Sequence, residues 1–223
     1  MKIISEVLQR QIEFSEENFC EWVIESPTFL TMLVEGFEKQ VSGESGRLIL
    51  CENGKELDIS KNVELILNPF IVNLNDKKIL NRVYSELTDI SLLEGMYGLT
   101  IEILNAIKNY MLTIEQESPY ILQYESNDLC VGELFRIFGA KIECDKNNML
   151  ENLCEYIKIM SKVFDKKLFV ILNMRSFMET EQIVLMLEEL LHYDIKILFI
   201  ENVQRDCLKI GKRYIMDKDR CEI

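Results

Sequence analysis

The hydrophobic residues of this chain follow two patterns that alternate along its length. A short continuous apolar run at 168–172 is typical of a strand buried on both faces of a parallel sheet, 195–200 predicts a second buried strand, and 63–67 predicts another strand. Longer segments, at 149–164 and 180–192, repeat their apolar residues at the spacing of a helix. The alternation of strand and helix in the last third predicts right-handed crossovers and a parallel sheet.

The N-terminal part of the chain adds further elements. An apolar run at 19–24 ends before Ser26-Pro27, where Ser as N-cap and Pro at the first helical position predict the start of a helix. Short apolar runs flank Asn53-Gly54, which is a strong signal for a hairpin turn. Two more short strands are expected later in the chain, at 140–143 and 213–216.

Between these parts lies a block in which the apolar residues keep helical spacing and no strand is predicted. Gly139 follows the block, and glycine commonly ends a helix. We therefore predict an α/β fold with an insertion. A parallel-sheet domain contains residues 1–72 and 140–223, and an inserted all-helical domain contains residues 73–139.

The composition is that of a globular protein. Of 223 residues, 48% are hydrophobic and 28% are charged, with 9 Gly and 3 Pro, which excludes disordered and fibrous classes. No apolar stretch approaches the roughly 20 residues of a membrane span, and the first residues are too polar for a secretory signal. We expect a cytoplasmic protein that does not associate with membranes.

Metal-binding cysteines and histidine-based catalysis are both poorly supported. The 7 cysteines form no C-x-x-C pair, so a structural zinc site is not expected. The single histidine, His192, follows an apolar helical run, and the end of that helix is its expected place. A catalytic triad would require this residue as its base.

Acidic residues are concentrated in two segments. The formal net charge of −13 argues against nucleic acid as a partner for the surface as a whole. Residues 1–60 carry −7 and residues 84–133 carry −8, whereas 61–83 carry +2 and 134–223 are neutral. The last two segments are therefore free to present a basic face.

The order of strand, loop and helix around residues 63–80 resembles that of a P-loop nucleotide-binding protein. The loop at 68–76 contains no glycine, although a phosphate cradle needs glycines so that backbone N–H groups can converge. Asn173 follows the next buried strand, where a P-loop enzyme usually places an Asp for Mg²⁺. The fold is expected to be P-loop-like without a nucleotide site.

Carboxylates cluster at residues 115–133. Glu125, Asp128 and Glu133 lie within nine residues, and Asn127 can add a carbonyl oxygen. Oxygen-rich clusters suit Ca²⁺, although the residue order is not that of an EF-hand loop. On the residues alone, a solvated acidic loop is the better of the two interpretations.

Basic residues gather in two places. Lys78 and Arg82 share a face of one helix, and Lys77 precedes them. A second group surrounds the next helix: Lys141, Lys146, Lys158, Lys162, Lys166 and Lys167. Ordinary surface lysines are the simpler interpretation of any one of them, because a phosphate-binding surface would need several copies of the chain.

One succession of segments is more specific. It consists of FGAKIE at 138–143, an amphipathic helix, KKLFVILN at 166–173, a second helix and IKILFIE at 195–201. This succession, with the start of a helix after 22–25 and the chain length, resembles the small ring-forming adaptation protein of type II-A CRISPR systems. No single motif carries the resemblance, which covers nearly the whole chain in element order.

The resemblance implies a fold, an assembly and a function. The family has an α/β head with a degenerate P-loop or RecA-like topology and a helical leg, and it forms a homotetrameric ring. The ring encloses linear double-stranded DNA through lysines that line its hole, without known catalytic activity and with no nucleotide expected. Ca²⁺ stabilises the leg and the ring, and the partners in spacer acquisition are the CRISPR integrase proteins and the effector nuclease.

Carried onto this sequence, the resemblance raises Glu125, Asp128 and Glu133 as calcium ligands. It makes Lys77, Lys78 and Arg82 the first expected DNA contacts, with Lys141 and Lys146 as the next candidates. Two alternatives remain from the residues. One is an ATPase with a divergent P-loop, and the other is an acidic scaffold that binds proteins without touching DNA.

Overall fold

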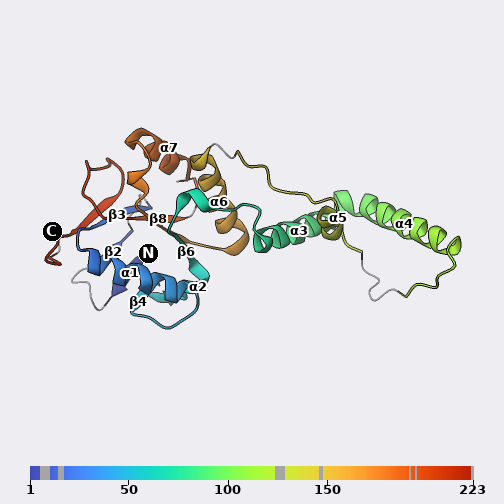
Figure 1. The fold of residues 1–223 in the computed structure, drawn as a ribbon, viewed down its shortest axis with the longest axis horizontal. Coiled ribbons are helices and arrows are strands. Elements are labelled where there is room, and N and C mark those ends of the chain that lie inside the picture. The colour runs from blue at the N-terminus through green and yellow to red at the C-terminus, as the bar shows by residue number, and fades with distance from the viewer. Residues whose placement is uncertain are drawn as a thin grey trace. The chain divides into compact units, whose positions relative to one another are not determined.

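The computed structural model describes residues 1–5, 11–14, 18–123, 129–145, 148–190, 192–193 and 195–221. The chain divides into two compact units (Figure 1). We call them the head unit, Met1–Asn73 with Asp145–Ile223, and the leg unit, Leu74–Cys144. The leg unit is therefore an insertion into the chain of the head unit.

The head unit is built on a five-stranded sheet in the order β6-β7-β8-β3-β9, in which every neighbouring pair is parallel. Its strands are β3 (Phe19–Ile24), β6 (Val63–Ile66), β7 (Leu168–Leu172), β8 (Lys196–Glu201) and β9 (Lys212–Met216). Val170 lies opposite Leu198, and Trp22 lies opposite Ile200. The prediction of a parallel α/β sheet drawn from both ends of the chain is confirmed, with β9 on its edge.

Helices cover both faces of this sheet, as Figure 1 shows. α1 (Pro27–Val41) lies on one face, and α6 (Met149–Phe164) and α7 (Thr180–Leu190) lie on the other. The core on the α1 side includes Trp22, Ile24, Phe29, Phe37, Val170 and Ile200. Burial of one large apolar side chain contributes roughly 1.5–3 kcal/mol, so this layer supplies a large share of the stability of the head unit.

A smaller antiparallel sheet, in the order β2-β1-β4-β5, belongs to the same unit. Its strands are β1 (Lys2–Ser5), β2 (Ile12–Glu13), β4 (Leu48–Glu52) and β5 (Lys55–Leu57), and α2 (Ile59–Asn62) follows. Asn53 and Gly54 have φ values of 50° and 77°, as a two-residue hairpin turn requires, so the predicted hairpin is confirmed. The sequence pattern does not predict β1 and β2, because such short strands show no clear period.

The described part of the leg unit contains α3 (Lys77–Ser91), α4 (Glu94–Gln116) and α5 (Val131–Ile137). α5 packs against α3 at Gly132, whose N–H donates to Thr88 Oγ1 at 2.9 Å. A Cβ atom at Gly132 would lie 2.8 Å from the carbonyl oxygen of Tyr84, so this close approach requires glycine. The helices expected in this region are present.

The predicted strand at 140–143 is wrong. These residues form no strand and belong to the leg unit, where their backbone bonds to side chains. The carbonyl of Ala140 accepts from the Tyr84 hydroxyl, and Ile142 bonds to the side chain of Asn75. The partners of this segment are side chains of the leg unit instead of a neighbouring strand.

No single helix in the described ranges is both long and apolar enough to span a membrane. The pair α3 and α4 meets the criteria of length and composition only when taken together, with a bend of 103° between them.

Candidate nucleic-acid interface

α3 begins with two exposed lysines. Asp76 is its N-cap, and Asp76 Oδ1 accepts the N–H of Lys78 at 2.8 Å, so Lys77 and Lys78 are the first two helical residues. A cation at a helix N-terminus opposes the helix dipole and lowers helix stability by about 0.3–1 kcal/mol. The same positive end attracts phosphate groups. The two lysines are thus unfavourable for the helix and well placed for an anionic ligand.

Lys141 is held beside the start of α3. The side chain of Asn75 makes two hydrogen bonds with the backbone of Ile142: Nδ2 donates to the carbonyl oxygen at 3.1 Å, and Oδ1 accepts from the N–H at 2.8 Å. The Tyr84 hydroxyl donates to the carbonyl oxygen of Ala140 on the other side of Lys141. The structure therefore places Lys141 near the start of α3, although the two are far apart in the sequence.

The remaining predicted contact residues divide between the described and undescribed ranges. Arg82 is exposed about one turn beyond Lys78 on α3. Across the described ranges, none of Lys77, Lys78, Arg82 and Lys141 forms an ion pair. Lys146 lies outside the described residues. The four described cations are therefore available to an anionic ligand.

Of the three predicted calcium ligands, Glu125 and Asp128 lie outside the described residues. Glu133 lies in the first turn of α5, and Arg136 Nη1 contacts both of its carboxylate oxygens, at 2.9 and 3.1 Å. The Arg136 guanidinium also donates to Asn81 Oδ1 at 3.1 Å and lies 6.0 Å from the ring centroid of Tyr84. Glu133 has the right donor chemistry for Ca²⁺, but an arginine on its own helix competes for it.

No group of three or more His, Cys, Asp or Glu side chains is placed to hold a metal ion within the ranges that the structure describes. Since two of the three predicted ligands lie outside those ranges, the calcium site stays a prediction.

The segment after β6 has the shape of a short 3-10 turn, η1 (Pro69–Ile71). Asn68 Oδ1 accepts the N–H of Phe70 at 2.9 Å, Pro69 has no N–H, and Phe70 packs against Phe177. The N–H group of Phe70 is thereby occupied by a side chain. The absence of a nucleotide site, expected from the missing glycines, stays a prediction.

A buried cluster of charges in the head unit was missed by sequence reasoning. Arg175, in η2 (Met174–Ser176), forms an ion pair with Glu21 of β3, with Nη1 2.8 Å from Oε1. Arg213 Nε donates to the other oxygen of Glu21 at 2.6 Å. A signal was available, because Glu21 is a single acid within an otherwise apolar run.

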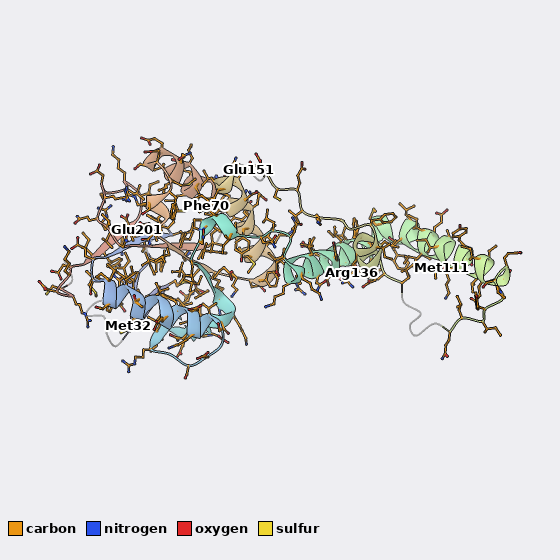
Figure 2. All side chains as sticks on the ribbon, in the orientation of Figure 1. Met32, Phe70, Met111, Arg136, Glu151 and Glu201 are labelled. Atoms are coloured by element: carbon orange, nitrogen blue, oxygen red, sulfur yellow. The ribbon has the colours of Figure 1, made fainter. Side chains whose placement is uncertain are left out.

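Glu201 is the incompletely satisfied member of this cluster (labelled in Figure 2). Its Oε1 accepts the N–H of Arg175 at 3.0 Å, whereas its Oε2 has no hydrogen-bond partner among the described residues. Burial raises the pKa of Glu201 to about 7, with the nearby charge of Glu21 adding to the increase. The cluster connects η2 to β3 and β8.

Comparison with known proteins identifies the family. The model of the family described as CRISPR-associated protein (Cas_Csn2) matches residues 40–220. The chain belongs to this family. A curated relative, CRISPR-associated protein Csn2 of Enterococcus faecalis, is 25% identical over 210 residues, which cover 88% of this chain and 90% of the relative.

The Csn2 match confirms the resemblance to a type II-A CRISPR-associated protein. It spans the last two residues of α1, all of the leg unit and the strands from β4 to β9. The lysines at the start of α3 and the predicted calcium ligands both lie within the matched range. Their roles stay predictions.

Proposed function

We propose that this Csn2-family chain is a non-catalytic protein of CRISPR spacer acquisition that binds linear double-stranded DNA. It does so as a homotetrameric ring whose hole is lined by lysines, and it contacts phosphates without reading sequence. The observation that carries the proposal is the grouping of Lys77, Lys78 and Lys141 at the start of α3, without acidic partners in the described ranges. Family membership supports the CRISPR-associated role.

The distribution of charge favours several copies acting together. One chain carries a net charge of −13, so a single copy offers DNA a small basic surface on a repelling background. Four copies that turned the start of α3 toward a common centre would combine sixteen cations from Lys77, Lys78, Arg82 and Lys141. Their acidic surfaces would then face outward and disfavour other contacts with nucleic acid.

α4 supports self-association. Thr100 is its one buried residue, and large apolar side chains remain exposed at steps of three, four or seven residues along one side: Met96, Leu99, Ile103, Tyr110 and Ile114. We call these five residues the α4 stripe. Apolar residues at this spacing form the contact line of paired helices, and a second copy of the chain offers the same stripe.

Calcium belongs to the same proposal. Glu125, Asp128 and Glu133 would hold the ion, which would supply positive charge to offset their mutual repulsion. Glu133 can take this role only by leaving Arg136. Arg136→Gln is therefore expected to raise calcium affinity several-fold in titration calorimetry, and Glu133→Gln to lower it. If neither variant changes the affinity, Glu133 is not a ligand.

The two alternatives make different predictions. An ATPase needs phosphate-binding N–H groups after β6, and the turn at η1 with its exposed Phe70 argues against that function. An acidic scaffold would bind proteins without using the lysines at the start of α3. Their unfavourable position relative to the helix dipole would then have no compensating function. Binding of ATP, or of protein partners alone, would support one of these alternatives.

The decisive experiment compares a labelled linear duplex with the same sequence as a closed circle, with and without Ca²⁺, across a series of salt concentrations. A closed ring should bind the linear form and not the circle, and affinity should fall steeply as salt rises. Equal binding of both forms would contradict enclosure of the DNA by a ring.

Charge reversal tests the assignment of residues. Lys77→Glu with Lys78→Glu should abolish binding of the linear duplex. The matched control is Lys39→Glu with Lys55→Glu, which makes the same change of charge at two exposed positions of the head unit. If both double variants lose the same affinity, the effect is one of net charge and the assigned surface is wrong.

A further inference from the structure

Arg136 of α5, labelled in Figure 2, contacts a face of α3 that carries two cations. Lys78, Asn81 and Arg82 stand at steps of three and four residues along α3, so their side chains share one face of that helix. The Arg136 guanidinium reaches this face from α5, because its Nη2 donates to Asn81 Oδ1 at 3.1 Å. A third cation, distant in the sequence, is thereby attached to the face that carries Lys78 and Arg82.

Further contacts fix the place of α5 and of its arginine. The guanidinium of Arg136 lies 6.0 Å from the ring centroid of Tyr84, which is buried in α3. α5 itself is joined to α3 at Gly132, whose N–H donates to Thr88 Oγ1. The chain after α5 is held by the Tyr84 hydroxyl, which donates to the carbonyl oxygen of Ala140. A cation that is already in place loses little conformational freedom when it binds a ligand.

Glu133 is the acid that neutralises Arg136. Arg136 Nη1 lies 2.9 Å from Glu133 Oε1 and 3.1 Å from Oε2. The two residues are three positions apart on α5, and their side chains are 51% and 44% exposed. Ion pairs this exposed are weak, because water screens the charges. An anion that binds Arg136 more tightly can therefore displace Glu133.

We propose that Arg136 is a further phosphate-binding residue of this chain and that Glu133 restrains it. In the free protein the carboxylate of Glu133 occupies Arg136 Nη1. When a duplex binds at Lys78 and Arg82, one of its phosphate groups displaces the carboxylate and takes its place. This inference rests on the proposed binding of DNA, to which it adds one contact residue and an internal competitor that lowers the affinity.

A DNA phosphate suits this group of cations better than the carboxylate does. Arginine presents a planar fork of N–H donors that matches two oxygens of one phosphate, whereas lysine offers a single charged point. Duplex DNA carries one negative charge per roughly 1.7 Å of its axis, so neighbouring phosphates can meet Arg136, Lys78 and Arg82 together. Glu133 offers a single negative charge to one of these cations.

The test is a double-mutant cycle on the binding of a labelled linear duplex across a series of salt concentrations. A chelator is present, so that no calcium competes for Glu133. Glu133→Gln should tighten binding by about threefold to tenfold. It should also steepen the slope of log affinity against log salt by about 0.9, which is the increment of one phosphate contact. Adding Arg136→Gln should cancel both changes.

Two further variants separate charge from geometry. Glu102→Gln makes the same change of charge at an exposed position of α4 and is the matched control. It should change the affinity by less than about twofold and leave the salt slope unaltered. Arg136→Lys in the Glu133→Gln background keeps the cation without its planar fork. This variant should keep the steeper slope and only part of the gain in affinity.

Each failure has its own signature. Tighter binding that persists with Arg136→Gln present would show that removal of an acid is sufficient, and it would overturn the inference. Unchanged or weaker binding by Glu133→Gln would overturn it as well. In both cases the proposed function stands as long as the unaltered protein binds the linear duplex. A protein that binds no linear duplex at any salt concentration, with or without Ca²⁺, would instead refute the proposed function itself.

Discussion

Asn75 holds Ile142 through both polar atoms of its side-chain amide, at 3.1 Å and 2.8 Å, and so takes the place of a neighbouring strand. This contact joins the two ends of the leg unit in the chain, and Lys141 lies next to it. The position of a proposed DNA-binding cation therefore depends on one neutral side chain that would not itself touch DNA.

Asn75→Ala should weaken binding of a linear duplex by about threefold to tenfold, because the segment that carries Lys141 loses two hydrogen bonds of about 1 kcal/mol each. Asn75→Asp keeps the acceptor for the Ile142 N–H, so its affinity for the duplex should lie between those of the unaltered protein and Asn75→Ala. Fluorescence anisotropy measures the affinity, with Asn105→Ala on the exposed surface of α4 as control. Unchanged binding by Asn75→Ala would mean that Lys141 does not contribute to the DNA contact.

Gly132→Ala should destabilise the leg unit by about 1–3 kcal/mol, as expected when a tight packing contact is overfilled. The added Cβ would lie 2.7 Å from Thr88 Oγ1 and 2.8 Å from the Tyr84 carbonyl oxygen. Gly95→Ala and Gly98→Ala are matched controls in α4, where nothing lies within 4 Å, and both should stabilise the helix by about 0.5–1 kcal/mol. Thermal unfolding followed by circular dichroism should show a lower melting temperature for Gly132→Ala and a higher one for the two controls.

The pH dependence of stability should carry the signature of Glu201. Its pKa rises from the usual 4.5 to about 7 on folding, so the folded protein binds this proton more tightly than the unfolded chain does. The stabilisation of the folded protein that results is fully present below about pH 4.5 and is lost as the pH rises to about 7. Across that window it amounts to about 3 kcal/mol of unfolding free energy.

Glu201→Gln removes this proton and keeps the acceptor for the N–H of Arg175. The unfolding free energy of the unaltered protein, relative to the variant, should therefore fall between pH 5 and pH 7. Urea titrations at several pH values measure the difference. A difference that does not change with pH would show that Glu201 titrates near its ordinary value.

Adjacent lysines in the head unit should differ sharply in their contribution to stability. Lys166 is buried, and its Nζ donates to the carbonyl oxygens of Ser60 at 2.8 Å and Val63 at 2.7 Å, while burial lowers its pKa. Lys166→Met leaves these acceptors unpaired and should remove about 2–4 kcal/mol of unfolding free energy. Lys167 forms a partly exposed ion pair with Glu52 at 2.9 Å, so Lys167→Met should remove at most about 1 kcal/mol. Equal losses in urea unfolding would contradict this distinction.

Strong periodicity is what made parts of the fold predictable. The helix at Met149–Phe164 and the strand at Leu168–Leu172 have the predicted bounds, because uninterrupted apolar faces leave one solution for burial. The antiparallel strands β1 and β2 are too short to show a period. The segment at 140–143 has the alternation of a strand, but its hydrogen bonds are decided by Asn75, which lies far away in the sequence.

The candidate interface was predictable as a list of residues and not as an arrangement. Composition and resemblance both pointed to Lys77, Lys78 and Lys141, but no spacing rule places Lys141 beside α3. That proximity depends on the contact between Asn75 and Ile142. The cluster around Glu21 and Arg175 was missed for a related reason, since its charges meet only when strands distant in sequence lie side by side.

The leg unit is inserted between two strands, β6 and β7, that pair directly with each other in the sheet. For the sheet, the whole leg is therefore a single loop whose ends are already fixed in register. The entropy of closing a flexible loop grows only with the logarithm of its length, so each doubling costs about 0.6 kcal/mol. Lengthening or shortening the leg would leave the strand register of the head unchanged. The proposed ring could therefore have a wider or narrower hole without any change in the sheet.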